Sequence, residues 1–460
     1  MWQRLTLVNL FLSLSACAGW QADVARLDSA LMILPDEGPR LPSFPPRTGA
    51  APQQNNAQLA ADFLDLEFAL ETGRTLPHLT RFEGDITYTL HGRVAASAAG
   101  DLALLLQRLR DEAGIALQQA EPGSAANITL NFLPKQVIRQ GNPGVACFVV
   151  PGISTYAEYR HGRNRQDWAT LQQRERLAIF LPGDASPQEI RDCLHEELAQ
   201  ALGPLNDLYR LSDSVFNDDN FHTVLTGYDM LMLRLHYAPE LQNGMSREQV
   251  AAVLPGLLAR LNPTGRRSGP VNVGATPAAW EAAMEMALGQ DGSALSRQQA
   301  AMDALAIAKA EGWNDTRLAF SLFALGRSQL SLNAKSSIAH FGDSAALYRR
   351  QPGGAIHAAH VDMQLAAFAL SQGWYDMADA LAVRNIPVVQ NAENAALLAS
   401  FLLIRAECAD QGQDHAAAQA LREEGMLWAR YGFGRGRELA ARIAAIAALV
   451  RPLAPAPDRG

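Results

Sequence analysis

The pattern of apolar and polar positions divides the chain into a mixed α/β part followed by a helical part. Short segments rich in β-branched and aromatic residues are expected to be strands. They lie at 85–91, 127–133, 146–150 and 176–181. Leucines at helical spacing over 102–113 predict a helix that ends at Gly114. Beyond residue 276 alanine is dense and strand-like alternation disappears, so this part is predicted to be all helical.

One helix within the first part is marked at both ends. Ser186-Pro187-Gln188-Glu189 has the form of a capping box with proline at the first helical position. Ile190, Leu194, Leu198 and Ala201 then form one apolar stripe, and Gly203-Pro204 stops the helix. Thr226-Gly227-Tyr228-Asp229 opens the next helix, whose Met230, Leu231, Leu233 and Leu235 are expected to pack inward.

The N-terminus has the form of an export signal. Arg4 precedes a short apolar run over residues 5–14, far below the roughly 20 residues that a spanning helix needs. Leu14-Ser15-Ala16-Cys17 resembles the lipobox of bacterial lipoproteins. The resemblance implies a signal peptide over 1–16, cleavage before Cys17 and lipidation of Cys17. Plain cleavage near Ala16 or Ala18, which would release a soluble secreted protein, is the alternative.

The remaining sequence suggests an order of regions. Residues 17–57 are rich in Pro, Gln and Asn and are expected to form a flexible tether. An α/β domain over 58–263, a linker over 264–276, a helical domain over 277–450 and a tail over 451–460 follow. The linker predicts that the two domains fold separately. Helices that close on Gly326, Gly373 and Gly412 resemble degenerate tetratricopeptide-like repeats, with an irregular helical bundle as the alternative.

Composition narrows the classes of partner. Hydrophobic residues make up 48% of the 460 residues, charged residues 19%, and the net charge is -8. A chain with this charge offers no basic surface for nucleic acid. Cys147 and Cys193 form a disulfide if the chain reaches an oxidising compartment, or else are small buried hydrophobes. Cys408 would then be a free thiol inside a helix.

The candidate chemistry lies just after Cys193. His195-Glu196-Glu197-Leu198-Ala199 begins like the zinc-peptidase pattern HExxH, but Ala199 stands where the second histidine must be. Since each residue turns a helix by about 100°, His195 is expected to point away from Glu197 and Gln200.

Shifted by one residue, the segment from Glu196 to Asn206 resembles the metzincin signature HExxHxxGxxH. Glu197 takes the place of the general base and Gly203 that of the helix-ending glycine. Ser214-Val215-Phe216 lies where metzincins have the Met-turn, and residues 225–237 resemble the helix that follows it. The same arrangement is similar to a family of bacterial envelope lipoproteins that carry Glu-Glu-x-x-Gln at this place. The resemblance covers only the first domain and implies an α+β zincin-like fold, followed by an all-α helical-repeat domain.

The departures from the signature bear on function. Glu196, Gln200 and Asn206, with Asp207 beside the last, replace the three histidines that bind zinc. Amide and carboxylate oxygens suit harder ions better than zinc. Without zinc, Glu197 has no metal-bound water to activate. The Asn217-Asp218-Asp219-Asn220 run and His222 are further candidates for a cation site, although such runs are usually solvated turns.

These observations favour an envelope lipoprotein that has lost zinc chemistry and acts in binding or scaffolding, with no cofactor expected. The expected partner is an envelope protein or peptide on the helical repeats, with the membrane reached through the lipid. The alternative is an envelope metallohydrolase, a peptidase or amidase, with Glu197 as general base and zinc or another divalent cation in a non-standard site. Ala18 follows the cysteine, where lipoprotein families associate Asp with the inner membrane, so the outer membrane facing the periplasm is expected.

Overall fold

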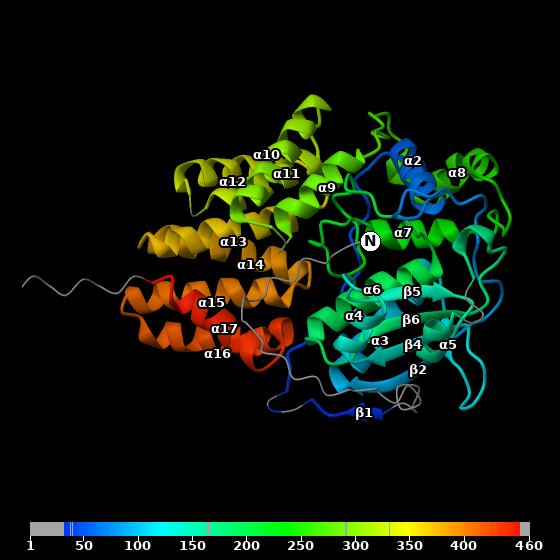
Figure 1. The fold of residues 1–460 in the computed structure, drawn as a ribbon, viewed down its shortest axis with the longest axis horizontal. Coiled ribbons are helices and arrows are strands. Elements are labelled where there is room, and N and C mark those ends of the chain that lie inside the picture. The colour runs from blue at the N-terminus through cyan, green and yellow to red at the C-terminus, as the bar shows by residue number, and fades with distance from the viewer. Residues whose placement is uncertain are drawn as a thin grey trace, which may run out of the picture.

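The structure consists of an α/β region followed by a run of helices (Figure 1), as the apolar pattern predicts. It is a computed structural model that describes residues 32–450, except 37, 39, 163–165, 290, 291 and 331. The predicted signal peptide, Cys17 and the tail over 451–460 lie outside the described residues. Within the described part, no helix has the length and apolarity needed to cross a membrane.

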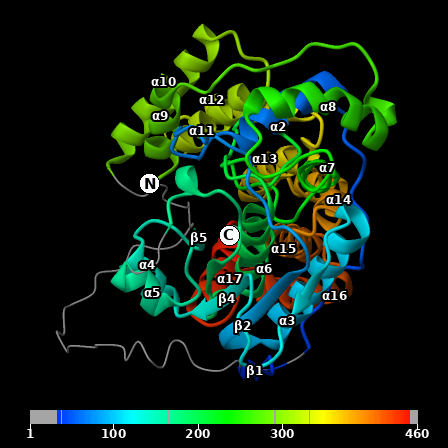
Figure 2. The same ribbon diagram turned by 90° about the vertical axis from the view of Figure 1, so that its right-hand side faces the viewer.

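A mixed sheet forms the centre of the α/β region (Figures 1 and 2). Its order is β1-β2-β4-β6-β5, and β3 also pairs with β2. All the pairings are parallel except that of β5 with β6. The strands are β1 (Met32–Leu34), β2 (Ile86–Ala95), β3 (Leu117–Gln119), β4 (Ile128–Leu133), β5 (Phe148–Pro151) and β6 (Leu177–Pro182).

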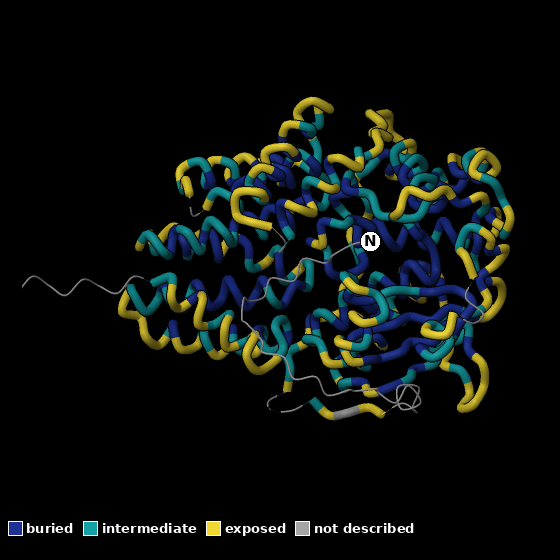
Figure 3. The backbone as a smooth tube through the Cα atoms, viewed as in Figure 1, coloured by how far each residue is buried: buried dark blue, intermediate teal, exposed yellow. Residues whose placement is uncertain are grey.

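Helices cover both faces of this sheet. On one face lie α3 (Ala96–Arg108) and α6 (Pro187–Leu202), which contact each other as well as the strands. On the other lie α4 (Lys135–Gly141) and α5 (Tyr156–His161), which share an apolar cluster with Ala178 and Phe180 of β6. Burial from both sides explains why every residue of β4 and β6 is buried. Figure 3 shows these strands as buried.

The predicted helix over 102–113 differs in detail from the observed one. α3 begins earlier, at Ala96, and its last turn widens into a π-helix, η1 (Leu109–Ala113). Gly114 then ends it in a left-handed conformation, φ 74°, as the sequence predicts. The remaining elements of the region are α2 (Asn56–Glu67), η2 (Trp168–Thr170), α7 (Gly227–His236), α8 (Arg247–Leu261) and η3 (Pro263–Gly265).

Consecutive helices of the second region pack against each other in pairs. They are α9 (Ala278–Leu288), α10 (Ala294–Ala310), α11 (Thr316–Gln329), α12 (Ala334–Tyr348), α13 (Ala355–Ser371), α14 (Tyr375–Asn391), α15 (Ala395–Gln411), α16 (His415–Phe433) and α17 (Arg437–Ala447). The turns after α13, α14 and α15 each place one residue at positive φ, at Gly373, Glu393 and Gln413. Gly326 does not end a helix as expected. It lies inside α11, where an added Cβ would come within 2.7 Å of the Phe341 ring.

Much of the segment predicted to be a flexible tether packs against the rest of the protein: β1 pairs with β2, and residues from 40 onward contact both regions. Phe44 is buried in the core of the helical region and lies 4.4 Å, between ring centroids, from Trp428 of α16. Farther along, the Gly49 N–H donates to Glu112 at 2.9 Å, and Ala50 passes so close to Gly227 that a Cβ there would clash. The prediction from composition is wrong here because Leu41 and Phe44 pack against apolar residues from distant parts of the chain. We call residues 40–55 the N-terminal strap.

The two regions share a buried interface besides the strap. Arg191 of α6 lies over the rings of Phe44 and Tyr431 and pairs with Glu393 of the α14–α15 turn. The Gln188 side chain accepts from the Ala396 N–H at 2.8 Å. Phe221 contacts the rings of Phe320, Phe323, Tyr348, His357 and His360 within the helical core. These contacts argue against the separate folding that the linker predicts.

Candidate functional site

Helix α6 carries the candidate residues, and its two ends are fixed by different means. Ser186 caps the first turn by accepting from the Glu189 N–H at 3.1 Å. The reciprocal half of the predicted capping box is missing, because the Glu189 carboxylate pairs with Lys135 at 2.7 Å instead. At the other end Gly203 terminates the helix, as predicted.

A buried arginine holds the C-terminal end of α6. The Arg174 guanidinium donates to the carbonyl oxygens of Gln200, Ala201 and Gly203 at 2.8, 2.9 and 2.6 Å. These are carbonyls that a helix end otherwise leaves unpaired. Burial lowers the pKa of Arg174. Arg174 therefore fixes the point at which the chain turns from Gln200 toward Asp207.

His195 does not contribute to the candidate site. It is buried, and its Nδ1 accepts from the Leu225 N–H at 3.1 Å. Burial, with Arg191 and Arg108 nearby, holds its pKa well below the ordinary value, so the ring is neutral. It lines a separate cavity between α3 and the N-terminal strap.

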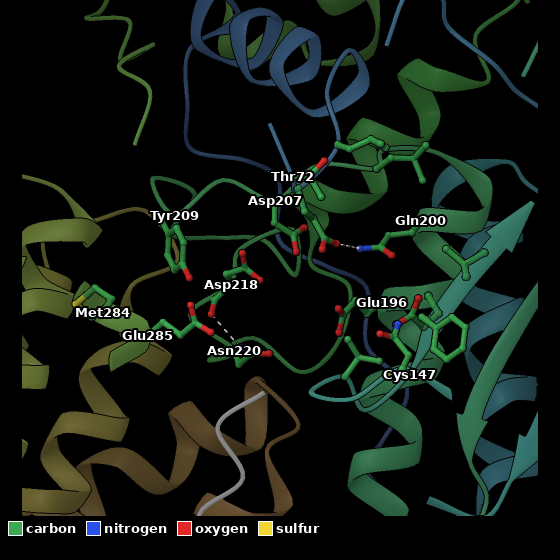
Figure 4. Close-up of a pocket in the computed structure, with 18 of the residues that line it drawn as sticks. Thr72, Cys147, Glu196, Gln200, Asp207, Tyr209, Asp218, Asn220, Met284 and Glu285 are labelled. Carbon is green, nitrogen blue, oxygen red and sulfur yellow. Dashed lines mark hydrogen bonds between the residues drawn. The ribbon is translucent and has the colours of Figure 1, made fainter. Parts of the chain in front are cut away.

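Most of the candidate residues line one cavity of about 310 Å³ (Figure 4). Glu196, Glu197, Gln200 and Asp207 all contribute to its wall. Asn206 does not, because its side-chain N–H donates to the Asp65 carbonyl at 2.9 Å. The side chain that stands in place of the third metzincin histidine therefore points toward α2 and away from the cavity. We call this cavity the acidic cleft, because the described residues that line it include six acidic ones and no Lys, Arg or His.

The amide of Gln200 is engaged by a residue that the sequence did not single out. Its Nε2 donates to Glu71 Oε1 at 3.0 Å, the dashed line beside Gln200 in Figure 4. Glu71 lies in the turn after α2, closed by a bridge between Ala69 and Thr75. A neutral amide here binds a carboxylate with its N–H, where an imidazole would offer a nitrogen lone pair to a metal.

The cleft is lined by carboxylates and aromatic rings. Its far wall comes from the helical region, with Met284 and Glu285 opposite Glu196 in Figure 4. Among the described residues that line it, none is Lys, Arg or His. The acidic side chains are Glu71, Glu196, Glu197, Asp207, Asp218 and Glu285, and the aromatic ones Phe148, Trp168, Tyr209 and Phe320.

Tyr209 lines the acidic cleft and also packs into the core of the helical region. Its ring meets Trp280 edge-to-face at 5.0 Å. Burial, together with Asp218, Glu281 and Asp219, raises the pKa of its hydroxyl far above the ordinary value, so it stays protonated. The Tyr209 hydroxyl is therefore neutral and adds no charge to the carboxylate-lined cleft.

The segment compared with the Met-turn packs into the apolar core that also contains α6. Phe216 is fully buried, and its carbonyl accepts from the Leu208 N–H at 3.0 Å. Asp229 accepts from Ser214 Oγ at 2.5 Å and from the Val215 and Thr226 N–H groups. Burial nevertheless raises the pKa of Asp229 to about 6. Thr226 and Asp229 form the predicted opening of α7, a complete capping box.

The acidic run at 217–220 forms local turns and a contact between the two regions. The Asp219 N–H donates to Asn217 Oδ1 at 3.1 Å, and the Asp219 carboxylate pairs with His357 of α13 at 2.9 Å. His222 Nε2 lies 3.1 Å from the Ser212 carbonyl, and burial beside His357 lowers the pKa of His222 to about 4. Across the described part of the chain, no cluster of three or more His, Cys, Asp or Glu has the geometry of a metal site.

Cys147 and Cys193 are joined by a disulfide with a Cα–Cα distance of 6.0 Å. Cys147 lines the acidic cleft just before β5, while Cys193 is buried in α6. The bond ties the antiparallel edge strand to the helix that carries Glu196 and Glu197. Cys408 is a buried free thiol.

Comparison with protein families gives one match. Residues 56–256 match the family described as a protein of unknown function, DUF2927. These residues form a DUF2927 domain. Searches of curated proteins and of solved structures found no match.

The DUF2927 domain contains only one side of the acidic cleft. It runs from the first residue of α2 into α8 and includes Glu71 and the candidate residues of α6. The opposite wall, with Met284, Glu285, Leu288 and Phe320, belongs to the all-helical region that follows the domain. That wall could not be predicted from the sequence, because apolar and acidic residues on a helix do not indicate which distant segment they face.

Proposed function

We propose that the protein is an exported lipoprotein in which the acidic cleft binds a cationic segment of an envelope protein or peptide, without zinc chemistry. The observation that carries the proposal is the cleft itself, with carboxylates and aromatic rings on walls from two regions. Ammonium and guanidinium groups are attracted both to carboxylates and to the faces of aromatic rings.

We propose in addition a zincin-like origin for the DUF2927 domain, a tetratricopeptide-like origin for the helical region, and a lipid anchor. The order of strands, helix and reversal at Gly203 supports a zincin-like ancestry for the DUF2927 domain. The paired helices and their similar turns support a tetratricopeptide-like origin for the helical region. The lipobox at Cys17 supports a lipid anchor in the outer membrane. Palmitate labelling that persists in Cys17→Ser would contradict the anchor.

The side chains at the three positions where metzincins have zinc-binding histidines do not favour a zinc enzyme. Gln200 and Asn206 direct their amide N–H groups at Glu71 and at a backbone carbonyl, and only Glu196 and Asp207 bring carboxylates to the cleft. The competing proposal, a hydrolase with Glu197 as general base, is favoured by one observation. Glu197 lines the same cavity as Glu196, Gln200 and Asp207.

Substitution of Glu197 separates the two proposals. In a binding protein, Glu197→Gln leaves most of the carboxylates of the cleft in place, so a deletion strain should still be complemented. In a hydrolase the change removes a general base that contributes about 10²–10⁴-fold to the rate. Loss of complementation with an unchanged melting curve would favour the enzyme.

A direct binding measurement tests the cleft. Full-length protein in detergent should bind fluorescent tetralysine, and the affinity should fall with salt because the contacts are ionic. Replacing both Asp218 and Glu285 with their amides should weaken binding at least several-fold. Asp343→Asn, at an exposed acid outside the cleft, is the matched control. Equal binding of tetralysine and tetraserine would contradict the proposal.

A further inference from the structure

A second cavity of about 280 Å³ adjoins the acidic cleft and differs from it in charge. It lies between α6, the segment 215–223, and helices α11 and α13. The two cavities share Glu196, Asn220, Leu288 and Phe320 in their walls. Ligand pockets commonly measure about 300–1,000 Å³, so this cavity suits a small ligand.

The wall formed by α6 is acidic. Asp192 and Glu196, four residues apart on one face of the helix, both line the cavity. Glu189 continues the same face, but its carboxylate is already paired with Lys135 at 2.7 Å. Asp192 and Glu196 also have partners within the protein, and their carboxylates make this wall of the cavity negatively charged.

The opposite wall carries a cation with no counterion. Arg327 of α11 lines the cavity, and its guanidinium forms no hydrogen bond or ion pair with any residue that the structure describes. Its guanidinium lies 5.8 Å from the centroid of the Phe323 ring, and burial lowers its pKa. A partly buried guanidinium without a carboxylate costs free energy, which an anionic ligand would recover.

A buried hydroxyl in the wall of the cavity also lacks a partner among the described residues. Thr223 is 8% exposed, and its hydroxyl makes no hydrogen bond within the described structure. Buried hydroxyls are normally hydrogen-bonded, so an unpaired one in a cavity wall points to a ligand or water. Leu288, Phe320, Phe323 and Met363 supply an apolar surface beside it.

We propose that this second cavity binds a small zwitterion, an amino acid or a short peptide with free ends. The carboxylate of the ligand would accept two hydrogen bonds from the Arg327 guanidinium, and its ammonium group would face Asp192 and Glu196. The apolar side chains would accept a small aliphatic side chain, and Thr223 would donate to or accept from the backbone. This ligand is separate from the cationic segment proposed for the acidic cleft.

Calorimetric titration of the full-length protein with dialanine tests the proposal. We expect saturable binding to the wild type, and at least tenfold weaker binding of N-acetyl-dialanine and of dialanine amide, each of which lacks one charge. Arg327→Gln and, independently, Asp192→Asn should each lower the affinity for dialanine at least tenfold. Arg297→Gln, at an arginine outside the cavity, should leave it unchanged.

Three outcomes would overturn the proposal. They are no saturable binding of dialanine to folded wild type, equal binding of all three probes, or unchanged binding in Arg327→Gln. Melting curves of Arg327→Gln and Asp192→Asn would test that both variants are folded. Tetralysine binding retained by Arg327→Gln would show that the acidic cleft is intact, so the two proposals fail separately.

Discussion

At the residue scale, the buried charges of the α/β region are placed by partners far away in the sequence. Arg174 finds its carbonyl acceptors at the end of α6, and Glu71 meets Gln200 across the cleft. The resemblance to the metzincin signature singled out Glu196, Glu197, Gln200 and Asp207, which line one cavity. The first three lie on α6, and Asp207 follows the end of that helix. Glu71, Trp168 and Tyr209 could not be predicted, since no local pattern indicates which loop faces which helix.

Replacing Arg174 should destabilise the fold more than replacing a surface arginine. Arg174→Met removes the donors of three buried carbonyl groups, each of which costs about 1–3 kcal/mol when unpaired, although water can reach some of them. We expect a loss of about 2–4 kcal/mol in the free energy of urea-induced unfolding. The control Arg110→Met removes an exposed pair with Asp111 and should change it by less than about 1 kcal/mol. Equal effects would show that Arg174 is not a structural cap.

The free energy of unfolding is expected to depend on pH through Asp213. This residue lies against Gly353 at the interface, and burial together with Asp229 raises its pKa to about 7. A carboxyl group with a raised pKa binds its proton in the folded state, so its stabilising contribution is complete below the unfolded pKa and is lost as the pH rises through about 7. Asp213→Asn should therefore gain stability relative to the wild type between pH 5 and pH 8, by on the order of 2 kcal/mol.

Chemical unfolding at several pH values measures this difference. Glu424→Gln, at an exposed acid of α16, should show a constant difference from the wild type over the same range. A constant difference for Asp213→Asn would mean that its carboxyl group is already ionised in the folded protein at pH 5.

At the element scale, most helices and strands follow from local patterns, and the exceptions have physical causes. Capping residues and apolar stripes located α6 and α7 because these signals are contained in a few neighbouring residues. The strand β1 was not predicted, because three residues carry too little periodicity and its pairing with Arg93–Ala95 is long-range. Gly326 was read as a helix end, whereas the absence of a side chain lets Phe341 pack against the middle of α11.

The disulfide between the start of β5 and α6 should contribute strongly to stability. Its partners are 46 residues apart, and closing a loop of this size typically stabilises a fold by about 2–4 kcal/mol. Cys147→Ser combined with Cys193→Ser should lower the free energy of unfolding by that amount. Wild type and double variant compared in reducing buffer provide the control, since the difference should then shrink. A difference that persists under reduction would indicate packing, not the covalent bond, as its source.

At the scale of the whole molecule, the DUF2927 domain and the helical region form a joint structure. The composition shift near residue 264 marked their boundary, but the shared core around Phe221 and Arg191 has no sequence signal of its own. The linker is itself held in place. Asn272 contacts Gln58, Arg210 and Asp315, although residues 266–275 are exposed.

Cleavage of the linker should not separate the two regions. Trypsin is expected to cut at the exposed Arg266-Arg267 pair, and the fragments should still elute as one species in size-exclusion chromatography because the interface is buried. Phe221→Ala removes an aromatic anchor from the helical core and should promote dissociation. Fragments of the wild type that elute apart and remain folded would support independent domains instead.

The N-terminal strap sets an order for synthesis and folding. Phe44 leaves the ribosome early, yet its partners Trp428 and Tyr431 belong to α16 and are made nearly 400 residues later. At about 5–20 residues per second, the strap waits tens of seconds before its binding site exists. The chain therefore cannot complete its fold vectorially from the N-terminus, and truncation of the last helices would leave the earliest segment without its partners.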